Sequence, residues 1–238
     1  MIELKNINGG YGKKQVLFDI NTIMHENEIT SIIGPNGCGK STLLEISSGL
    51  MKPYEGVVVA DGVNIHEMNA KDRAKKISVL SQQKNPGALT VRALVYHGRF
   101  PYLGYPRKYR DEDRKIVDEA MRTAGMYDLA EESLSELSGG QQQKAYIAML
   151  LAQNPDIVFL DEPVTFLDIN YQLELMEIIK ELKNNGKTVI MVIHDINLAM
   201  SYSDKIIAMK NGRIVFDGKP TKMCESNVLE SIFGIKAN

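Results

Sequence analysis

The chain has 238 residues, of which 44% are hydrophobic and 24% charged, and this composition is ordinary for a globular protein with a full core. Its formal net charge of −2 provides no general attraction to nucleic acid, which argues against a nucleic-acid-binding protein. The two cysteines, Cys38 and Cys224, are too few for a disulfide framework or a metal site, so we expect a reducing cytosolic compartment.

Neither the N-terminus nor the apolar runs indicate a membrane segment. Residues 1–5 lack the positive region and apolar stretch of a secretory signal. The longest apolar runs, near 145–152 and 189–193, fall far short of the roughly 18 residues that a spanning helix needs. We therefore expect any membrane role to depend on a partner.

Short strands separated by turns are predicted for the first third of the chain. They lie at residues 2–7, 16–20, 28–33 and 56–59, with Asp61-Gly62 as a turn. A helix is predicted directly after residue 42, with Leu43, Leu44 and Ile46 on its buried side.

The middle of the chain, residues 85–149, changes character. It opens with Pro86-Gly87, continues through a loop rich in proline and glycine, and becomes helical over residues 111–124. We expect this segment to be a helical insertion in a single domain, whose core comprises residues 1–84 and 150–238.

Strands and helices alternate after residue 150. The predicted strands are 157–160 and 188–193, and the predicted helices are 170–184 and 196–202. This alternation indicates a parallel sheet covered by helices on both faces, and thus an α/β fold. Residues 205–218 predict short strands with Asn211-Gly212 as a hairpin turn.

A glycine-rich segment between the predicted strand 28–33 and the following helix matches the G-x-x-x-x-G-K-S pattern of phosphate-binding loops. Its residues are Gly34, Pro35, Asn36, Gly37, Cys38, Gly39, Lys40, Ser41 and Thr42. Glycines let successive backbone N–H groups turn towards phosphate at a helix N-terminus. Lys40 would supply a cation to the β and γ phosphates, Ser41 would offer its hydroxyl to Mg²⁺, and Cys38 is a small residue at a variable position. The segment predicts a nucleotide site.

Two further segments carry polar groups suited to that site. Asp161 and Glu162 follow the apolar run 157–160, where Asp161 would hold Mg²⁺ through water and Glu162 would polarise the attacking water. Ser138, Gly139, Gly140 and Gln141 precede a predicted helix at 142–151, with Ser138 as its N-cap. No second phosphate-binding lysine accompanies this segment, and a capped helix is its plain alternative interpretation.

Together these motifs resemble those of the ATP-binding-cassette ATPases, over nearly the whole chain. The resemblance implies a P-loop NTPase core with a mostly parallel sheet, an antiparallel β subdomain and an inserted helical subdomain. It assigns Leu137–Gln141 to the signature motif, which completes the ATP site of the opposite subunit and so implies a homodimer. Four other residues match positions with known roles in the family. Gln82 matches the glutamine that contacts Mg²⁺ and water, and Asp168 matches the aspartate in the loop that crosses the dimer. His194 matches the histidine that senses the γ-phosphate, and Tyr11 matches the aromatic residue that stacks on adenine.

The chain departs from the usual family pattern at several positions beside these motifs. They are Ser81, Gln142, Lys144, Val164 and Thr165. None of them removes a catalytic group. Because Gln142 and Lys144 come just after the signature motif, the family pattern does not predict the surface of the helix that follows it.

The subfamily is indicated by residues 89–95 and 98–104, which resemble a region of importers for ferric siderophores, haem and cobalamin, and by residues 165–169 and 194–199. The resemblance implies that the protein binds integral-membrane permease subunits at the cytoplasmic face of the membrane, and that it works indirectly with an extracytoplasmic substrate-binding protein.

An importer of bare zinc or manganese ions is the nearest alternative. A soluble cassette ATPase acting on ribosomes or DNA is another, although such proteins usually carry two cassettes or long coiled coils. A GTPase is disfavoured because we find no guanine-reading motif.

Residues 99–110 combine aromatic and basic side chains, the types enriched at protein interfaces. They include Phe100, Tyr102, Tyr105 and Tyr109 among Arg99, Arg107, Lys108 and Arg110. We expect this loop to lie beside the surface that docks the permease. The alternative is that its tyrosines cover the core of the insertion itself.

Overall fold

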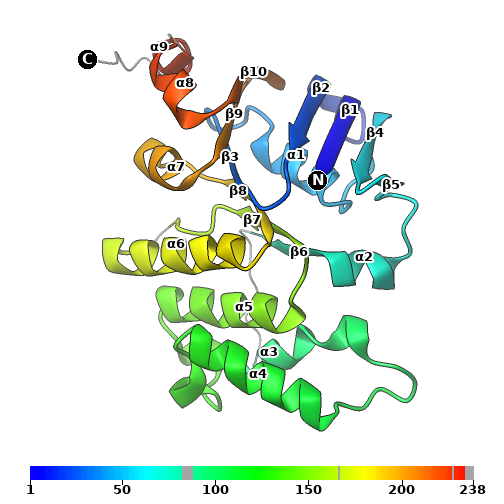
Figure 1. Cartoon of the computed structure of the whole chain (residues 1–238), viewed down its shortest axis with the longest axis vertical. Coiled ribbons are helices and arrows are strands. Elements are labelled where there is room, and N and C mark those ends of the chain that lie inside the picture. Colours follow the sequence, from blue (N-terminus) through cyan, green and yellow to red (C-terminus); the bar gives the residue numbers. More distant parts are fainter. Residues whose placement is uncertain (82–87, 166, 227, 234–238) are drawn as a thin grey trace.

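The computed structural model describes residues 1–81, 88–165, 167–226 and 228–233, and Figure 1 shows how its helices and strands are arranged. In chain order they are β1 (Ile2–Tyr11), β2 (Lys14–Met24), β3 (Ile29–Ile33), α1 (Lys40–Ser47), β4 (Glu55–Ala60), β5 (Val63–Asn64), α2 (Ala70–Lys76), β6 (Ile77–Leu80), α3 (Val91–His97), η1 (Phe100–Tyr102), α4 (Asp111–Thr123), η2 (Tyr127–Leu129), η3 (Leu134–Glu136), α5 (Gly139–Gln153), β7 (Ile157–Asp161), α6 (Ile169–Asn184), β8 (Thr188–Val192), α7 (Ile196–Tyr202), β9 (Lys205–Lys210), β10 (Arg213–Gly218), α8 (Pro220–Cys224) and α9 (Val228–Phe233).

The first sheet is antiparallel and has the strand order β2-β1-β4-β5. Alternation along β1 buries Ile2 and Leu4 on one face, as the period of two in a strand requires. A register shift between Leu4 and Ile7 breaks this alternation and lets Ile7 enter the same core. Both expected turns form with positive φ, at Asp61-Gly62 and at Asn211-Gly212.

The second sheet has the strand order β10-β9-β3-β8-β7-β6. Its five strands from β9 to β6 pair in parallel, and β10 adds an antiparallel edge. All residues of β3 and β8 are buried, because this sheet is covered on both faces. Apolar residues of α1 pack between the two sheets, whereas α6 and α7 pack on the opposite face of the parallel sheet. The expected α/β class is confirmed.

Helices α3, α4 and α5 pack around a separate apolar core, seen as the green group in Figure 1. Helix α5 joins this group to the parallel sheet, since Ala145 and Ala148 lie in the helical core while Ile147 and Leu150 lie in the sheet core. This helix begins at Gly139 rather than at residue 142, and Ser138 caps it as expected.

The loop 99–110 largely folds back onto the helical group. Arg99 is only 8% exposed, the Tyr102 hydroxyl donates to the Gln153 carbonyl at 2.8 Å, and the Tyr109 ring lies 4.4 Å from that of Tyr96. Tyr105 is fully exposed. Packing onto the group of helices α3–α5 therefore holds for Tyr102 and Tyr109, and contact with a permease stays a prediction.

Arg99 forms a buried ion pair whose loss should destabilise the protein. Its Nε donates to Asp113 at 2.9 Å and its Nη1 to the Ala152 carbonyl at 2.8 Å. Burial alone would raise the pKa of Asp113, but the Arg110 amide and the Arg99 guanidinium lower it overall. Because Arg99→Ala leaves a buried carboxylate without its cation, we expect the free energy of unfolding to fall by about 3–5 kcal/mol.

Denaturant titration measures this loss, and Arg114→Ala is the matched control. Arg114 contacts Asp111 only at the surface, at 3.9 Å, where an ion pair contributes roughly 0–1 kcal/mol. Equal stability of the two variants would show that the Arg99 pair does not hold the loop.

Candidate nucleotide-binding site

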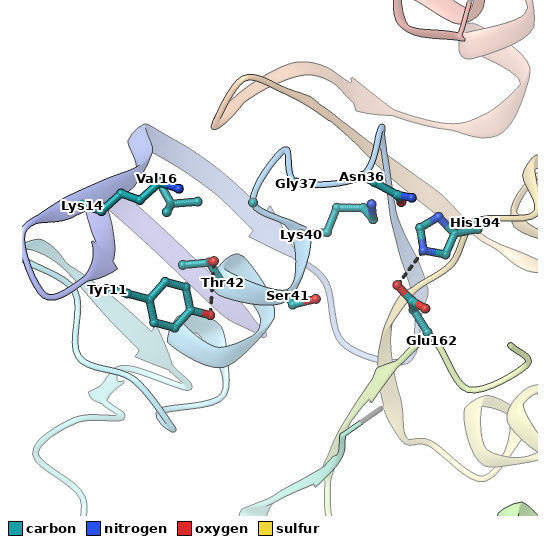
Figure 2. A pocket seen from close by; sticks show the side chains of 11 residues that line it. Tyr11, Lys14, Val16, Asn36, Gly37, Lys40, Ser41, Thr42, Glu162 and His194 are labelled. Atoms are coloured by element: carbon teal, nitrogen blue, oxygen red, sulfur yellow. Dashed lines mark hydrogen bonds and ion pairs between the residues drawn. The ribbon is translucent and has the colours of Figure 1, made fainter. Parts of the chain in front are cut away.

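The polar segments singled out in the sequence meet at one edge of the parallel sheet. The phosphate-loop motif follows β3, Asp161 ends β7 with Glu162 directly after it, and His194 follows β8. Carboxyl ends of parallel strands form the usual crevice for ligands. A cavity of about 470 Å³ lies there, and Figure 2 shows the side chains around it. Its lining residues are Tyr11, Lys14, Val16, Asn36, Gly37, Gly39, Lys40, Ser41, Thr42, Glu162 and His194.

The loop 34–42 has the backbone that its glycines predict. Gly34 has φ 150°, and a Cβ there would lie 2.4 Å from the Met209 carbonyl oxygen, so only glycine fits. Lys40 opens α1, and its ammonium donates to the Gly34 and Pro35 carbonyls at 2.9 and 3.1 Å. Lys40 is 6% exposed. The loop thus places one cation and the N-terminus of α1 beside the cavity, an arrangement that suits phosphate.

Ser41 and Asp161 form the pair best suited to a divalent cation. The Ser41 hydroxyl donates to Asp161 Oδ1 at 3.2 Å. Burial raises the pKa of Asp161, the Ser41 bond opposes that, and the carboxylates of Glu162 and Glu45 raise it further. The nearby Lys40 ammonium lowers this pKa, but by less than the other effects raise it. Hydroxyl and carboxylate oxygens are ligands that Mg²⁺ accepts alongside phosphate oxygens and water, so these residues fit the ion.

The described residues contain no group of three or more His, Cys, Asp or Glu side chains able to hold a metal. A metal bound at Ser41 and Asp161 would take its other ligands from groups such as phosphate oxygens, water or a side-chain amide oxygen.

Glu162 and His194 lie next to each other at one end of the cavity, and the dashed line in Figure 2 marks the contact between them. Glu162 Oε1 lies 2.5 Å from His194 Nε2, and Glu162 Oε2 accepts from the Thr165 hydroxyl at 3.3 Å. Glu162 has φ 53°, a conformation that costs a residue with a Cβ roughly 1–3 kcal/mol and is often found at functional sites. Its amide donates to the Val192 carbonyl at 3.1 Å, which holds the strained residue against the next strand.

Tyr11 stands at the other end of the cavity from Glu162 (Figure 2). The ring is half exposed, and its hydroxyl donates to Glu45 Oε2 at 2.9 Å. The Thr42 hydroxyl lies 3.5 Å from the same phenolic oxygen. Burial raises the pKa of Tyr11 and the Glu45 carboxylate adds to this, while Thr42 opposes it. The phenol therefore remains a proton donor at neutral pH.

Residues 138–141 and Asp168 do not line this cavity, although the structure describes all of them. Ser138 and Gln141 form a reciprocal capping box at the start of α5, and Asp168 caps α6 through the Asn170 and Tyr171 amides. Gly140 lies against the Tyr171 ring, which a Cβ would approach to 3.1 Å. The starts of the two helices are thus packed together.

One expected residue, Gln82, lies outside the described residues. Four residues were not predicted for the site: Lys14 and Val16, which line the cavity, Glu45, which bonds Tyr11, and Thr165, which bonds Glu162. Glu45 lies one helical turn after Thr42, so a shared helix face was the available signal.

Comparison with known proteins gives the family of this chain. The family model described as "ABC transporter" matches residues 17–165. The chain belongs to the ABC transporter family.

Curated members of this family are similar over nearly the full chain. The petrobactin import ATP-binding protein YclP of Bacillus subtilis (strain 168) is 44% identical over 98% of this chain and 92% of its own length. The ferric enterobactin transport ATP-binding protein FepC of Escherichia coli (strain K12) is 42% identical over 95% of this chain and 84% of its own length.

Solved structures of the family have the same fold. A dimeric structure of the bacterial ABC transporter cassette MJ0796 aligns with a TM-score of 0.83 at 35% identity, covering 92% of this chain and 99% of that chain. A dimeric post-hydrolysis state of MJ0796 bound to ADP and Pi aligns with a TM-score of 0.82 at 33% identity, over the same shares of both chains. The expected family and ATPase class are confirmed.

No helix within the described ranges is both long and apolar enough to span a membrane.

Proposed function

We propose that this protein is the ATP-hydrolysing subunit of an ABC importer that takes up a metal chelate. One observation carries the proposal: the loop 34–42, Glu162 and His194 meet around one cavity, with Asp161 bonded to Ser41 of that loop, in a chain similar to siderophore-import ATP-binding proteins. Since those relatives are named for petrobactin and ferric enterobactin, a ferric siderophore is the first candidate substrate, before haem or cobalamin.

The residues around the cavity divide the work of hydrolysis. Residues 34–42 bind the phosphates through backbone amides and the Lys40 cation. Glu162 is the general base for the attacking water, and His194, at 2.5 Å from it, contacts the γ-phosphate. The Tyr11 ring is the platform for adenine, since its half-exposed face borders the cavity.

Ser41 and Asp161 would hold Mg²⁺, with Gln82 as a further contact. When bound, this ion supplies positive charge that neutralises the β and γ phosphate oxygens. The raised pKa of Asp161, caused first by burial, supports the assignment because a cation would stabilise the ionised carboxylate.

A homodimer completes the site. Residues 138–141 offer a helix N-terminus that lies outside the cavity of their own subunit, and the similar cassette MJ0796 is dimeric. Residues 138–141 and Asp168 of each subunit therefore face the nucleotide of the other subunit.

The remaining partners and the domain division follow the same proposal. Integral-membrane permease subunits bind the protein at the cytoplasmic face of the membrane, and an extracytoplasmic protein delivers the chelate to them. Residues 1–84 and 150–238 form the nucleotide-binding core, and residues 85–149 form the helical insertion. The separate apolar core of α3–α5 supports this division.

Uptake by the reconstituted importer tests the proposal. The protein is combined in liposomes with its permease subunits and binding protein, and uptake of a ⁵⁵Fe-loaded siderophore is measured with ATP inside. We expect uptake that depends on ATP and is unaffected by excess free Zn²⁺ or Mn²⁺. Transport of the bare ions instead would establish the first alternative.

A filter-binding titration with RNA and DNA tests the second alternative, a soluble ATPase acting on ribosomes or DNA. With a net charge of −2 the protein releases few counterions on such binding, so we expect no submicromolar affinity at physiological salt. A salt-sensitive, submicromolar complex would favour that alternative.

A further inference from the structure

The Tyr11 ring is fixed at the cavity by a side chain from a different element. Tyr11 ends β1, whereas Glu45 lies in the second turn of α1, the helix that starts in the phosphate loop. The phenol donates to the Glu45 carboxylate at 2.9 Å. A hydrogen bond to an ionised acceptor is stronger and more directional than one between neutral groups. The bond thus restrains the tilt of the ring relative to α1.

The backbone of the same hairpin is anchored separately. Tyr11 pairs with Lys14 across the turn, and the Tyr54 hydroxyl donates to the Gly12 carbonyl at 2.9 Å. With the hairpin held in this way, rotation of the Tyr11 side chain is the freedom that remains. Glu45 restricts the χ1 part of this rotation, because a change in χ1 would carry the phenolic oxygen away from the carboxylate and break the bond.

We propose that Glu45 is a positioning residue for nucleotide-base recognition: it holds the Tyr11 ring in the orientation that stacks on the base. This inference rests on the proposed role of Tyr11. Glu45 is absent from the cavity lining, so it acts through Tyr11 and not on the nucleotide. Its carboxylate would repel phosphate in any case, and a direct phosphate contact is excluded on charge grounds.

A pair of ligands separates this role from a general effect on the site. ATP carries the base, whereas inorganic tripolyphosphate carries only the phosphates, and both are titrated calorimetrically with Mg²⁺ present. Glu45→Ala should weaken ATP binding about threefold to tenfold, the effect of one hydrogen bond, and should leave tripolyphosphate affinity within about twofold. Glu45→Gln should bind ATP nearly as the parent does, because its amide oxygen still accepts from the phenol.

Two further variants complete the test. Tyr11→Ala should lower ATP affinity by about tenfold or more, since stacking of a base on an aromatic ring contributes roughly 1–3 kcal/mol, again with tripolyphosphate unaffected. Glu119→Ala, an exposed site on α4, is the matched control and should change neither ligand.

The outcomes are distinguishable. If Tyr11→Ala leaves the ratio of ATP to tripolyphosphate affinity unchanged, the proposed adenine platform fails, and the role of Glu45 fails with it. If Tyr11→Ala changes that ratio but Glu45→Ala does not, only the positioning role is overturned. If Glu45→Gln is as damaging as Glu45→Ala, the charge and not the hydrogen bond is responsible, and the inference is again wrong.

Discussion

Replacing Lys40 with alanine is expected to abolish tight ATP binding. In the structure the Lys40 ammonium bonds the Gly34 and Pro35 carbonyls, so it already lies in the loop that receives the phosphates. One hydrogen bond to a charged group contributes about 1.5–3 kcal/mol. Loss of the contacts to the β and γ phosphates therefore predicts an affinity at least roughly 100-fold lower. The backbone amides and the N-terminus of α1 remain, but they carry only partial charges.

Isothermal titration with ATP and Mg²⁺ measures this loss. Lys13→Ala is the matched control, because Lys13 is exposed in the neighbouring β1–β2 turn and is absent from the cavity lining. The control changes net charge by the same amount and should keep its affinity. Unchanged ATP affinity in Lys40→Ala, with an unchanged melting temperature, would show that the phosphates bind elsewhere.

The parts of the site that the sequence predicted are those encoded by short contiguous patterns. The phosphate loop is readable because glycine, lysine and serine follow the predicted strand 28–33 at fixed spacing, and β3 is indeed buried along its whole length. Asp161 and His194 were placeable because both follow buried strands, and parallel strands present their carboxyl ends at one edge. For these residues the local sequence pattern is enough to predict their place in the tertiary structure.

The parts that could not be predicted depend on contacts between distant positions. Tyr11 and Glu45 are 34 residues apart, and nothing local to either position indicates the pair. Arg99 was expected in an interface loop because arginine and aromatic residues are enriched at protein interfaces, yet the chain folds back and buries it against Asp113. Helix α2 has no buried residue, so it leaves no apolar periodicity by which a helix is recognised.

Glu162→Gln should keep ATP binding and slow hydrolysis by roughly 10²–10⁴-fold, the usual effect of losing a positioned general base. Glutamine preserves the size of the side chain and can still bond Thr165 and His194, the partners seen at 3.3 and 2.5 Å. It cannot accept the proton of the attacking water. Phosphate release under saturating ATP measures the change, and Glu181→Gln, an exposed site on α6, should hydrolyse normally.

The same variant tests whether the site is shared between two subunits. Because hydrolysis is what would reopen the closed site, Glu162→Gln with ATP should accumulate as a homodimer, measurable by size exclusion with light scattering. ADP should leave it monomeric, since residues 138–141 of the partner then meet no γ-phosphate. Near-normal turnover would move the base from Glu162 to another group, with His194 the next candidate. If Glu162→Gln is slow but stays monomeric with ATP, Glu162 remains the base and the shared site is rejected. Residues 138–141 would then have no nucleotide to contact.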